Sequence, residues 1–335
     1  MQLIRWLGAS IAIILVMQPP VAAATAPEPV RIQSDGVELR GELLLPTGAG
    51  RHPAIVYLHG SGCATREDMR RFAVHFAARG YAGLLLDKRG CGESQGQWQK
   101  ASLEDLAADA VSALRFLAGR TDIDAARLGL WGISQSGWVA PIAANRSGLA
   151  RFVVIVTGGG TAPHDVERFG YMGRLAQAGF QFSELPEAQD LFDDYLRYLA
   201  SGMDRDKLLL AIEAVSQAPW YAAMNLSRVL PSEADRPAWA WVATYDPVSD
   251  IGKLRVPALV LLGAQDRDTP LTESVSYWTK GLGANGIARS QVVIFPLAGH
   301  GLTVGGHHGP DAPRVYDEGF LPTVEAWLNT ISPAD

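Results

Sequence analysis

Short, mostly apolar segments that alternate with helical patterns are the feature that most constrains the fold of this chain. Six such segments lie at 54–58, 81–86, 127–131, 152–156, 258–262 and 291–295. Continuous apolar strands are typical of a parallel sheet that is covered on both faces. Helical spacing of apolar residues separates or follows them at 67–79, 102–117, 135–144 and 312–330. The alternation predicts an α/β fold with a mostly parallel, doubly wound sheet.

A hairpin precedes this region, and a long insertion interrupts it. Segments 30–34 and 37–45 flank Asp35-Gly36, a strong signal for a two-residue turn. Residues 158–255, 98 in number, carry no strong strand signal, but they contain apolar residues at one-face helical spacing. We therefore expect 158–255 to form a mainly helical cap inserted into one sheet domain, because loops of this length usually carry structure of their own.

Composition excludes several classes of protein. Of 335 residues, 48% are hydrophobic, which is enough apolar surface to exclude a disordered chain. Two cysteines cannot make the framework of a disulfide-stapled miniprotein. A net charge of −6 without a basic run argues against a nucleic-acid partner or an anionic membrane. These values fit a globular enzyme and specify nothing narrower.

The first 24 residues have the pattern of a secretory signal peptide. Arg5 is their one charged residue, an apolar run covers 7–17, and Ala22-Ala23-Ala24 supplies small residues before a cleavage site. About 11 apolar residues are too few to span a bilayer, which argues against an uncleaved anchor. We expect cleavage after Ala24 and a secreted or periplasmic domain of residues 25–335, without a membrane span after cleavage.

The strongest chemical signal is Gly132-Ile-Ser134-Gln-Ser136-Gly137, where an apolar strand runs directly into a helix. In this setting G-x-S-x-G forms a nucleophile elbow, a sharp turn that presents a serine at the strand end. The residues two positions away must be small, and Gly132 meets this need. Ser136 stands where a second glycine is expected. The pattern predicts Ser134 as a nucleophile; the alternative is an ordinary strand–helix junction that Ser134 caps.

With two further motifs, the chain resembles an α/β hydrolase of the secreted esterase and peptidase-like branch. His59-Gly60-Ser61-Gly62 follows the strand at 54–58, and Asp87-Lys-Arg-Gly-Cys-Gly-Glu-Ser94 follows the strand at 81–86. The resemblance covers residues 30–331, and the cap is its least diagnostic part. It implies the α/β-hydrolase fold and a catalytic triad in the chain order serine, acid, histidine. His59 precedes the serine and resembles the family's structural histidine.

The resemblance places the remaining triad residues in the loops after the last two strands. His300, directly after the strand at 291–295, is the expected base, and Asp266, three residues after Gly263, is the expected acid. Asp268 is the competing acid, although its simpler role is a helix N-cap before a proline.

The other histidines near the end of the chain suggest an alternative. His300, His307 and His308 together would make a metal site, but no carboxylate or cysteine cluster completes it. We therefore expect neither a metal nor an organic cofactor.

An acyl-transfer site also needs N–H donors for the oxyanion of the tetrahedral intermediate. Gln135 offers its backbone N–H at the start of a helix, and the loop after His59-Gly60 should supply the second donor from Ser61. The charges at Lys88, Arg89 and Glu93 are expected to pair locally rather than to bind substrate.

The two cysteines follow consecutive strands that should be neighbours in the sheet. In an exported protein, Cys63 and Cys91 would form a disulfide between two loops at the active-site edge. Two free, buried thiols remain the alternative, and neither cysteine lies on an elbow that would make it a nucleophile.

The sequence therefore predicts a serine hydrolase that cleaves carboxylic esters of small molecules. A secreted peptidase acting on short peptide-like substrates is the main alternative, and a thioesterase or lactonase would use the same triad. A non-catalytic binding scaffold is disfavoured because all three triad positions are filled. The substrate-binding residues are not determined. Aromatic residues of the cap suggest either an apolar substrate pocket or plain cap packing, and they are Trp220, Tyr221, Trp239 and Trp241.

Overall fold

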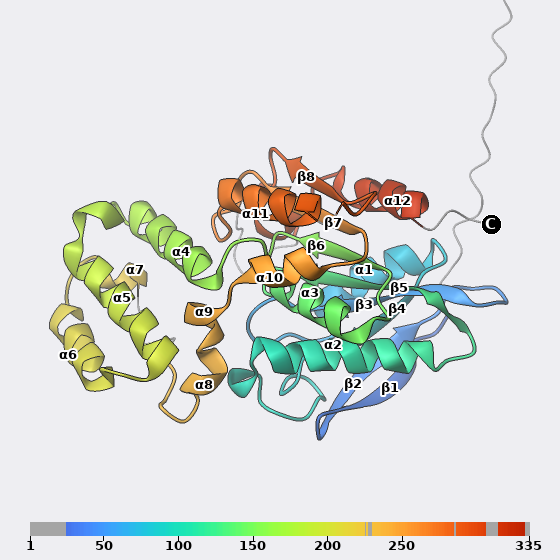
Figure 1. The fold of residues 1–335 in the computed structure, drawn as a ribbon, viewed down its shortest axis with the longest axis horizontal. Helices are drawn as coiled ribbons and strands as arrows, with labels where there is room; N and C mark the ends of the chain where they lie inside the picture. The colour runs from blue at the N-terminus through green and yellow to red at the C-terminus, as the bar shows by residue number, and fades with distance from the viewer. Residues whose placement is uncertain (1–24, 225, 227–229, 285, 306–313, 332–335) are drawn as a thin grey trace, which may run out of the picture.

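In the computed structural model, one eight-stranded sheet runs through the molecule (Figure 1). The structure describes residues 25–331 except 225, 227–229, 285 and 306–313, so the expected signal peptide lies outside the described residues. The strand order is β1-β2-β4-β3-β5-β6-β7-β8. The strands are β1 (Glu28–Ser34), β2 (Val37–Leu44), β3 (His52–Leu58), β4 (Ala82–Leu86), β5 (Ile123–Ile133), β6 (Phe152–Val156), β7 (Ala258–Gly263) and β8 (Gln291–Phe295).

The sheet confirms the predicted topology. The hairpin strands β1 and β2 pair antiparallel, and β2 also runs antiparallel to β4. All pairings from β4 to β8 are parallel. Every residue of β4, β6 and β7 is buried, as continuous apolar strands require. The carboxyl ends of the parallel strands therefore lie at one edge of the sheet, where the predicted site residues follow them.

Helices cover both faces of the sheet, and each layer has its own core. One face packs against α2 (Leu103–Ala118), α3 (Ser136–Ser147), α10 (Pro247–Lys253) and α11 (Leu271–Ala284). The other face packs against α1 (Glu67–Ala77) and α12 (Phe320–Ile331). Strand residues alternate between the two cores: Val56 belongs to the first, and Ile55 and Tyr57 belong to the second.

The last helix begins later than the sequence suggested. Its apolar spacing predicted a helix over 312–330, but α12 begins at Phe320. Tyr316 instead forms an antiparallel β-bridge with Thr303, and Asp317 donates its backbone N–H to the carbonyl of Leu302 at 2.9 Å. These contacts hold the chain in an extended form just before the helix.

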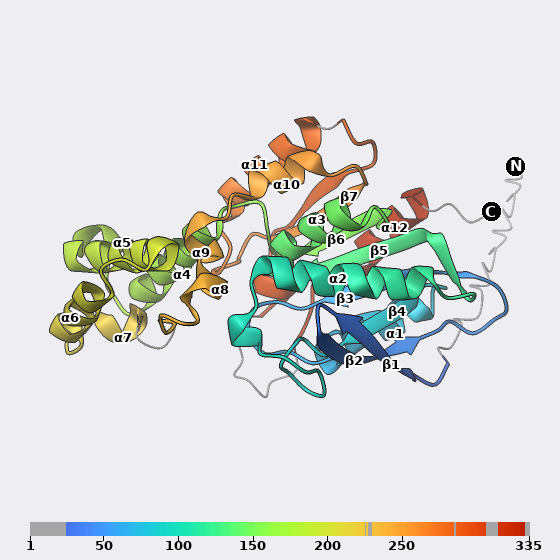
Figure 2. The same ribbon diagram turned by 60° about the horizontal axis from the view of Figure 1, so that its bottom comes forward.

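The long connection after β6 is helical. It contains α4 (Pro163–Gln177), a 3₁₀ turn at Phe182–Glu184, α5 (Pro186–Ser201), α6 (Arg205–Val215), α7 (Tyr221–Met224), α8 (Arg236–Trp239) and α9 (Trp241–Thr244). Helix α10 also lies within the expected cap of 158–255, but its Ile251 belongs to the first core of the sheet. Helices α4 to α7 stand together at one end of the molecule, beyond the sheet (Figures 1 and 2). Their apolar side chains form a third core, separate from the two that flank the sheet.

The cap contacts the sheet domain through α8. The indole Nε1 of Trp239 donates to the carbonyl oxygen of Gln99 at 2.7 Å, and Lys100 Nζ lies 3.5 Å from Asp235 Oδ1. Gln99 and Lys100 belong to the 3₁₀ turn Trp98–Lys100 that follows β4. No helix within the described ranges is both long and apolar enough to cross a membrane.

Candidate active site

The turn between β5 and α3 holds Ser134 in a left-handed backbone conformation, with φ = 53°. Its N–H donates to the carbonyl of Val156 on the neighbouring β6 at 3.0 Å, and its own carbonyl accepts from Gly137 N–H at 2.8 Å. A positive φ is uncommon outside glycine and costs on the order of 1–3 kcal/mol where the surroundings enforce it. This is the local geometry of a nucleophile elbow.

Small neighbours make this turn possible. A Cβ added at Gly132 would lie 2.6 Å from the carbonyl oxygen of Ser136, and one added at Gly158 would lie 2.0 Å from that of Ser134. Ser136, at the position of the family's second glycine, is buried and donates its hydroxyl to the carbonyl oxygen of His59. The departure from the pattern is thus accommodated by a hydrogen bond, whereas the need for Gly158 was missed by sequence reasoning.

His300 and Asp266 form a hydrogen-bonded pair. His300 Nδ1 lies 2.9 Å from Asp266 Oδ2. The other oxygen, Oδ1, accepts from the backbone N–H groups of Asp268 at 2.8 Å and Thr269 at 3.0 Å. Burial lowers the pKa of His300, but the hydrogen bond to Asp266 and the charges of Asp266 and Asp268 outweigh it, so the pKa lies above 6.5.

The same residues bear on the metal alternative. In the described part of the chain, Asp266, Asp268 and His300 have potential ligand atoms that all lie within 4.8 Å of one another. Both oxygens of Asp266 already accept hydrogen bonds, one set from backbone N–H groups and one shared with His300. These contacts fit a carboxylate that orients an imidazole. The other two histidines of the alternative, His307 and His308, lie outside the described residues.

Thr157 connects the loops that carry this pair. It directly follows β6 with φ = 47°, a rare conformation for a β-branched residue, and it is fully buried. Its hydroxyl accepts from the N–H of Gly301 at 2.9 Å, next to His300. Its carbonyl accepts from the hydroxyl of Thr269, near Asp266, at 3.4 Å. The sequence offered no local signal for this role.

The loop after β3 lies beside Ser134. A Cβ added at Gly60 would be 3.3 Å from the Cβ of Ser134 and 3.9 Å from its Oγ. Ser61 follows in this loop, and Gln135 follows Ser134 with its side chain buried. The two predicted oxyanion donors therefore flank the predicted nucleophile from two different loops.

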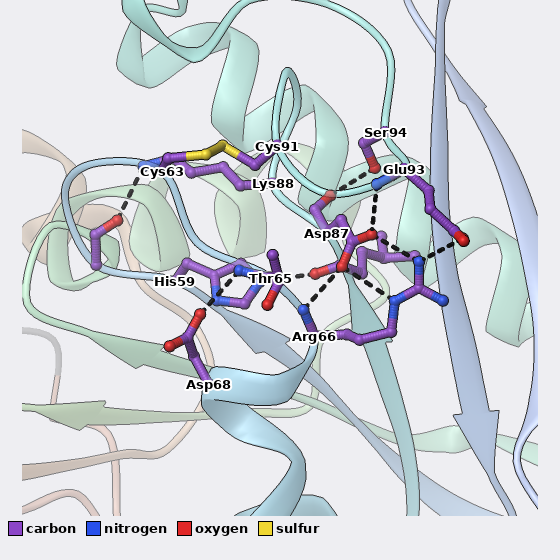
Figure 3. Close-up of a disulfide and its surroundings, with 12 residues drawn as sticks. His59, Cys63, Thr65, Arg66, Asp68, Asp87, Lys88, Cys91, Glu93 and Ser94 are labelled. Carbon is purple, nitrogen blue, oxygen red and sulfur yellow. Dashed lines mark hydrogen bonds and ion pairs between the residues drawn. A yellow bond between two sulfur atoms is a disulfide. The ribbon is translucent and has the colours of Figure 1, made fainter. Parts of the chain in front are cut away.

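A disulfide between Cys63 and Cys91 joins the loops after β3 and β4. Figure 3 shows it above a charged cluster of the same two loops. Arg66 donates to both oxygens of Asp87, at 3.0 and 2.6 Å, and reaches Glu93 at 2.7 Å. Asp87 also accepts from the backbone N–H groups of Arg66 and Glu93, both at 2.9 Å. The two loops are thus connected covalently and by charged hydrogen bonds.

Two further charged residues of the loop after β4, Arg89 and Lys88, have different kinds of partner. Arg89 pairs locally with Asp109 at 2.6 Å, as expected. Lys88 instead contacts Gly60 and Gln135, in the two loops that carry the predicted oxyanion donors. His59 donates from Nε2 to the carbonyl oxygen of Leu86 at 2.7 Å, and burial lowers the pKa of His59. A buried imidazole in this position fits the structural role that the resemblance implied.

Two adjoining cavities open at the site. The first, of about 480 Å³, is lined by Ser134, His300 and Asp268 together with Arg174 and Arg314. The second, of about 490 Å³, lies between the sheet domain and the cap. Ser61 and Glu167 line both cavities. A ligand in contact with Ser134 can therefore extend beneath the cap.

Only part of the aromatic set of the cap faces this space. Trp239 and Trp241 line the second cavity together with Trp98. The ring centroids of Trp239 and Trp241 lie 6.4 Å apart, with 23° between the ring planes. Trp220 and Tyr221 are buried in the core of the cap. Trp220 and Tyr221 therefore serve cap packing, whereas Trp239 and Trp241 line a cavity in which the substrate pocket stays a prediction.

Residues 35–299 match the sequence profile of the X-Pro dipeptidyl-peptidase (S15) family. Among curated proteins, the quorum-quenching protein AidA of Acinetobacter baumannii (strain MDR-ZJ06) is 36% identical over 134 residues, 38% of this chain and 43% of that protein. The thiohydrolase aneE of Aspergillus aculeatus (strain ATCC 16872 / CBS 172.66 / WB 5094) is 36% identical over 123 residues, 36% of this chain and 38% of that protein. The chain spans less than half the length of these relatives.

The fold has many counterparts among solved structures. The α/β hydrolase GrgF from Penicillium sp. sh18 superposes with a TM-score of 0.60, covering 91% of this chain and 99% of that one. At 17% identity, this similarity concerns the fold alone.

Proposed function

We propose that this chain, which belongs to the S15 family of α/β hydrolases, is a serine hydrolase that cleaves carboxylic esters. The observation that carries the proposal is the convergence of Ser134 and the His300–Asp266 pair. Ser134 and His300 line one cavity, and Asp266 orients the imidazole through its hydrogen bond with Nδ1. A strained serine beside a carboxylate-oriented histidine is the arrangement that nucleophilic acyl transfer requires.

In the proposed reaction, Ser134 Oγ attacks the ester carbonyl while Nε2 of His300 takes its proton. Asp266 accepts the Nδ1 hydrogen, which fixes the tautomer and stabilises the imidazolium. The N–H groups of Ser61 and Gln135 hold the oxyanion. His300 then protonates the leaving alcohol, and water, activated in the same way, releases the acid from Ser134. This chain's own residues supply every proton transfer in the scheme.

The test is covalent labelling combined with hydrolysis of p-nitrophenyl esters. A fluorophosphonate probe should label the wild-type chain at Ser134, and Ser134→Ala should abolish both labelling and hydrolysis. Ser136→Gly is the matched control, because it restores the family's glycine and should still be labelled. Undiminished labelling of Ser134→Ala would refute the assignment, and an unlabelled wild-type chain would favour a non-catalytic scaffold.

We propose that part of the substrate lies in the second cavity. Trp98, Trp239 and Trp241 give it flat apolar walls, and Gln135 places it next to the oxyanion site. Esters with an aromatic acyl or alcohol group should therefore be preferred over short alkyl esters. Trp239→Ala should raise KM for these aromatic esters more than for a short alkyl ester such as ethyl acetate.

A peptidase is the second candidate, favoured by the family profile and by Glu167. This carboxylate lines both cavities, burial raises its pKa, and it makes no salt bridge with any described residue. It would suit a substrate with a cationic amino group. A panel of p-nitrophenyl esters, acyl thioesters, lactones, and aminoacyl and dipeptidyl p-nitroanilides decides between these acyl classes. Faster cleavage of the anilides would overturn the esterase proposal.

We also propose that the chain is exported and cleaved after Ala24. The support is the sequence pattern of residues 1–24 alone. Intact-mass analysis of protein from its native source should give a mature chain that begins at Thr25.

A further inference from the structure

The two proposed oxyanion donors belong to different loops, and the hole works only if both N–H groups point at one oxygen. Ser61 lies in the loop after β3, whereas Gln135 lies at the start of α3. A third loop, after β4, carries Lys88, whose side chain extends back toward both of them. This lysine was expected to pair locally with neighbouring charges.

The Lys88 ammonium contacts both donor residues. Its Nζ donates to the carbonyl oxygen of Gly60 at 2.8 Å and to the side-chain Oε1 of Gln135 at 2.8 Å. Lys88 is only 8% exposed, and no carboxylate of the described residues lies within salt-bridge distance of it. The buried charge is therefore held by two neutral oxygens, one from each oxyanion loop.

The bond to Gly60 acts on the proposed donor through one peptide group. The carbonyl of Gly60 and the N–H of Ser61 belong to the same planar peptide unit. Fixing the oxygen therefore fixes the direction of the Ser61 N–H. A cation on the oxygen also polarises the unit, which makes the N–H a stronger donor. The bond to Gln135 fixes the N-cap residue of α3 in the same way, and no described residue accepts its backbone N–H, which leaves that group for the oxyanion.

Two connections hold Lys88 in place. Its side chain runs alongside the Cys63–Cys91 disulfide in Figure 3, and Cys91 lies three residues after it. On its other side, Asp87 is held by Arg66. The backbone N–H of Lys88 donates to the carbonyl of Ala64 at 3.1 Å. The lysine therefore extends from a backbone that is tied to the same β3 loop whose carbonyl it contacts.

We propose that Lys88 is the positioning residue of the oxyanion hole, linking Gly60 and Gln135 so that the Ser61 and Gln135 N–H groups converge. This inference rests on the proposed serine-hydrolase function. Burial lowers the pKa of Lys88 to about 8, which agrees with an ammonium that is removed from water and from carboxylates.

Lys88→Met tests the proposal, because methionine keeps the apolar stem and removes the donor. We expect kcat for p-nitrophenyl esters to fall about 10- to 100-fold with KM within about twofold, somewhat less than the loss of an oxyanion donor itself. Binding of a trifluoromethyl ketone, which forms an oxyanion on Ser134, should weaken by the same factor. Lys88→Arg should restore part of the loss. Lys253→Met, at an exposed position on α10, is the matched control and should leave kcat unchanged.

Gln135→Met keeps the backbone N–H and removes only the side-chain acceptor. If Lys88 acts partly through this contact, the double variant should lose less than the product of the two single losses. Fully multiplicative losses, or a Lys88→Met variant with wild-type kcat, would overturn the proposal. If Lys88→Met fails to fold, Lys88→Leu also removes the donor and provides the same kinetic comparison. Failure of the proposed function would look different, because the wild-type chain itself would then neither react with fluorophosphonate nor hydrolyse esters.

Discussion

Replacing Asp266 by asparagine tests the proposed triad with a change of one atom. The two oxygens of Asp266 have different partners, and this decides how the asparagine amide must lie. Oδ1 accepts from the backbone N–H groups of Asp268 and Thr269. An NH₂ group placed there would face two donors, so the amide oxygen must keep this position and the NH₂ must face His300 Nδ1.

The consequence is a wrong tautomer of the base. With an N–H donor opposite it, Nδ1 of His300 must act as an acceptor, so the ring hydrogen moves to Nε2. Nε2 is then unable to take the proton of Ser134 at the start of the reaction. In the serine-protease template the same change lowers kcat by about 10⁴-fold, equivalent to about 5 kcal/mol of transition-state stabilisation. We expect a loss of that order, with KM nearly unchanged.

The assay is steady-state hydrolysis of a p-nitrophenyl ester, with thermal unfolding measured in parallel. Asp268→Asn is the matched control, because Asp268 is exposed and supports the His300–Asp266 pair through its charge and its backbone N–H. Its kcat should stay within about fivefold of the wild-type value. A larger loss for Asp268→Asn than for Asp266→Asn would refute the assignment of the acid. A folded Asp266→Asn variant with near-normal kcat would refute the role of the pair.

Three further outcomes are expected. Catalysis needs neutral His300, whose pKa is raised, so kcat/KM should rise with pH above 6.5. The charge of Asp268 contributes to the raised pKa, so Asp268→Asn should move the rise in kcat/KM to lower pH. Replacing both cysteines by alanine should lower the free energy of unfolding by about 3 kcal/mol in urea titrations, because the disulfide closes a loop with a sequence separation of 28. Gly158→Ala should reduce kcat at least about 100-fold by displacing Ser134, whereas Gly252→Ala, with open space around it, should not.

The sheet and the positions of the predicted triad were accessible from sequence because their signals are local. A strand buried on both faces, such as β6, must be apolar at every position, so it is visible without its neighbours. The turn that exposes Ser134 needs a small residue two positions before it, and Gly132 lies within the same short segment. The loops that follow the strands meet at one edge, and the family resemblance assigned Asp266 and His300 to two of these loops.

Other features of the site depend on residues that are distant in the chain. Gly158 is required because β6 passes against the elbow, and its added Cβ would strike the Ser134 carbonyl. Thr157 connects the acid and base loops, which lie more than 100 residues further along. No local pattern encodes such contacts, because each one exists only after the strands have paired.

The sequence by itself determined the α/β class, the inserted helical cap and the order of Ser134, Asp266 and His300. Tertiary structure alone decided that Trp239 faces the second cavity while Trp220 is buried in the cap, since the helical pattern is the same whichever surface covers it. It also decided that Lys88 contacts both loops of the proposed oxyanion donors instead of a nearby carboxylate. The physical reason is that burial and hydrogen-bond partners are set by which loops the sheet brings together, and not by the residues adjacent in the chain.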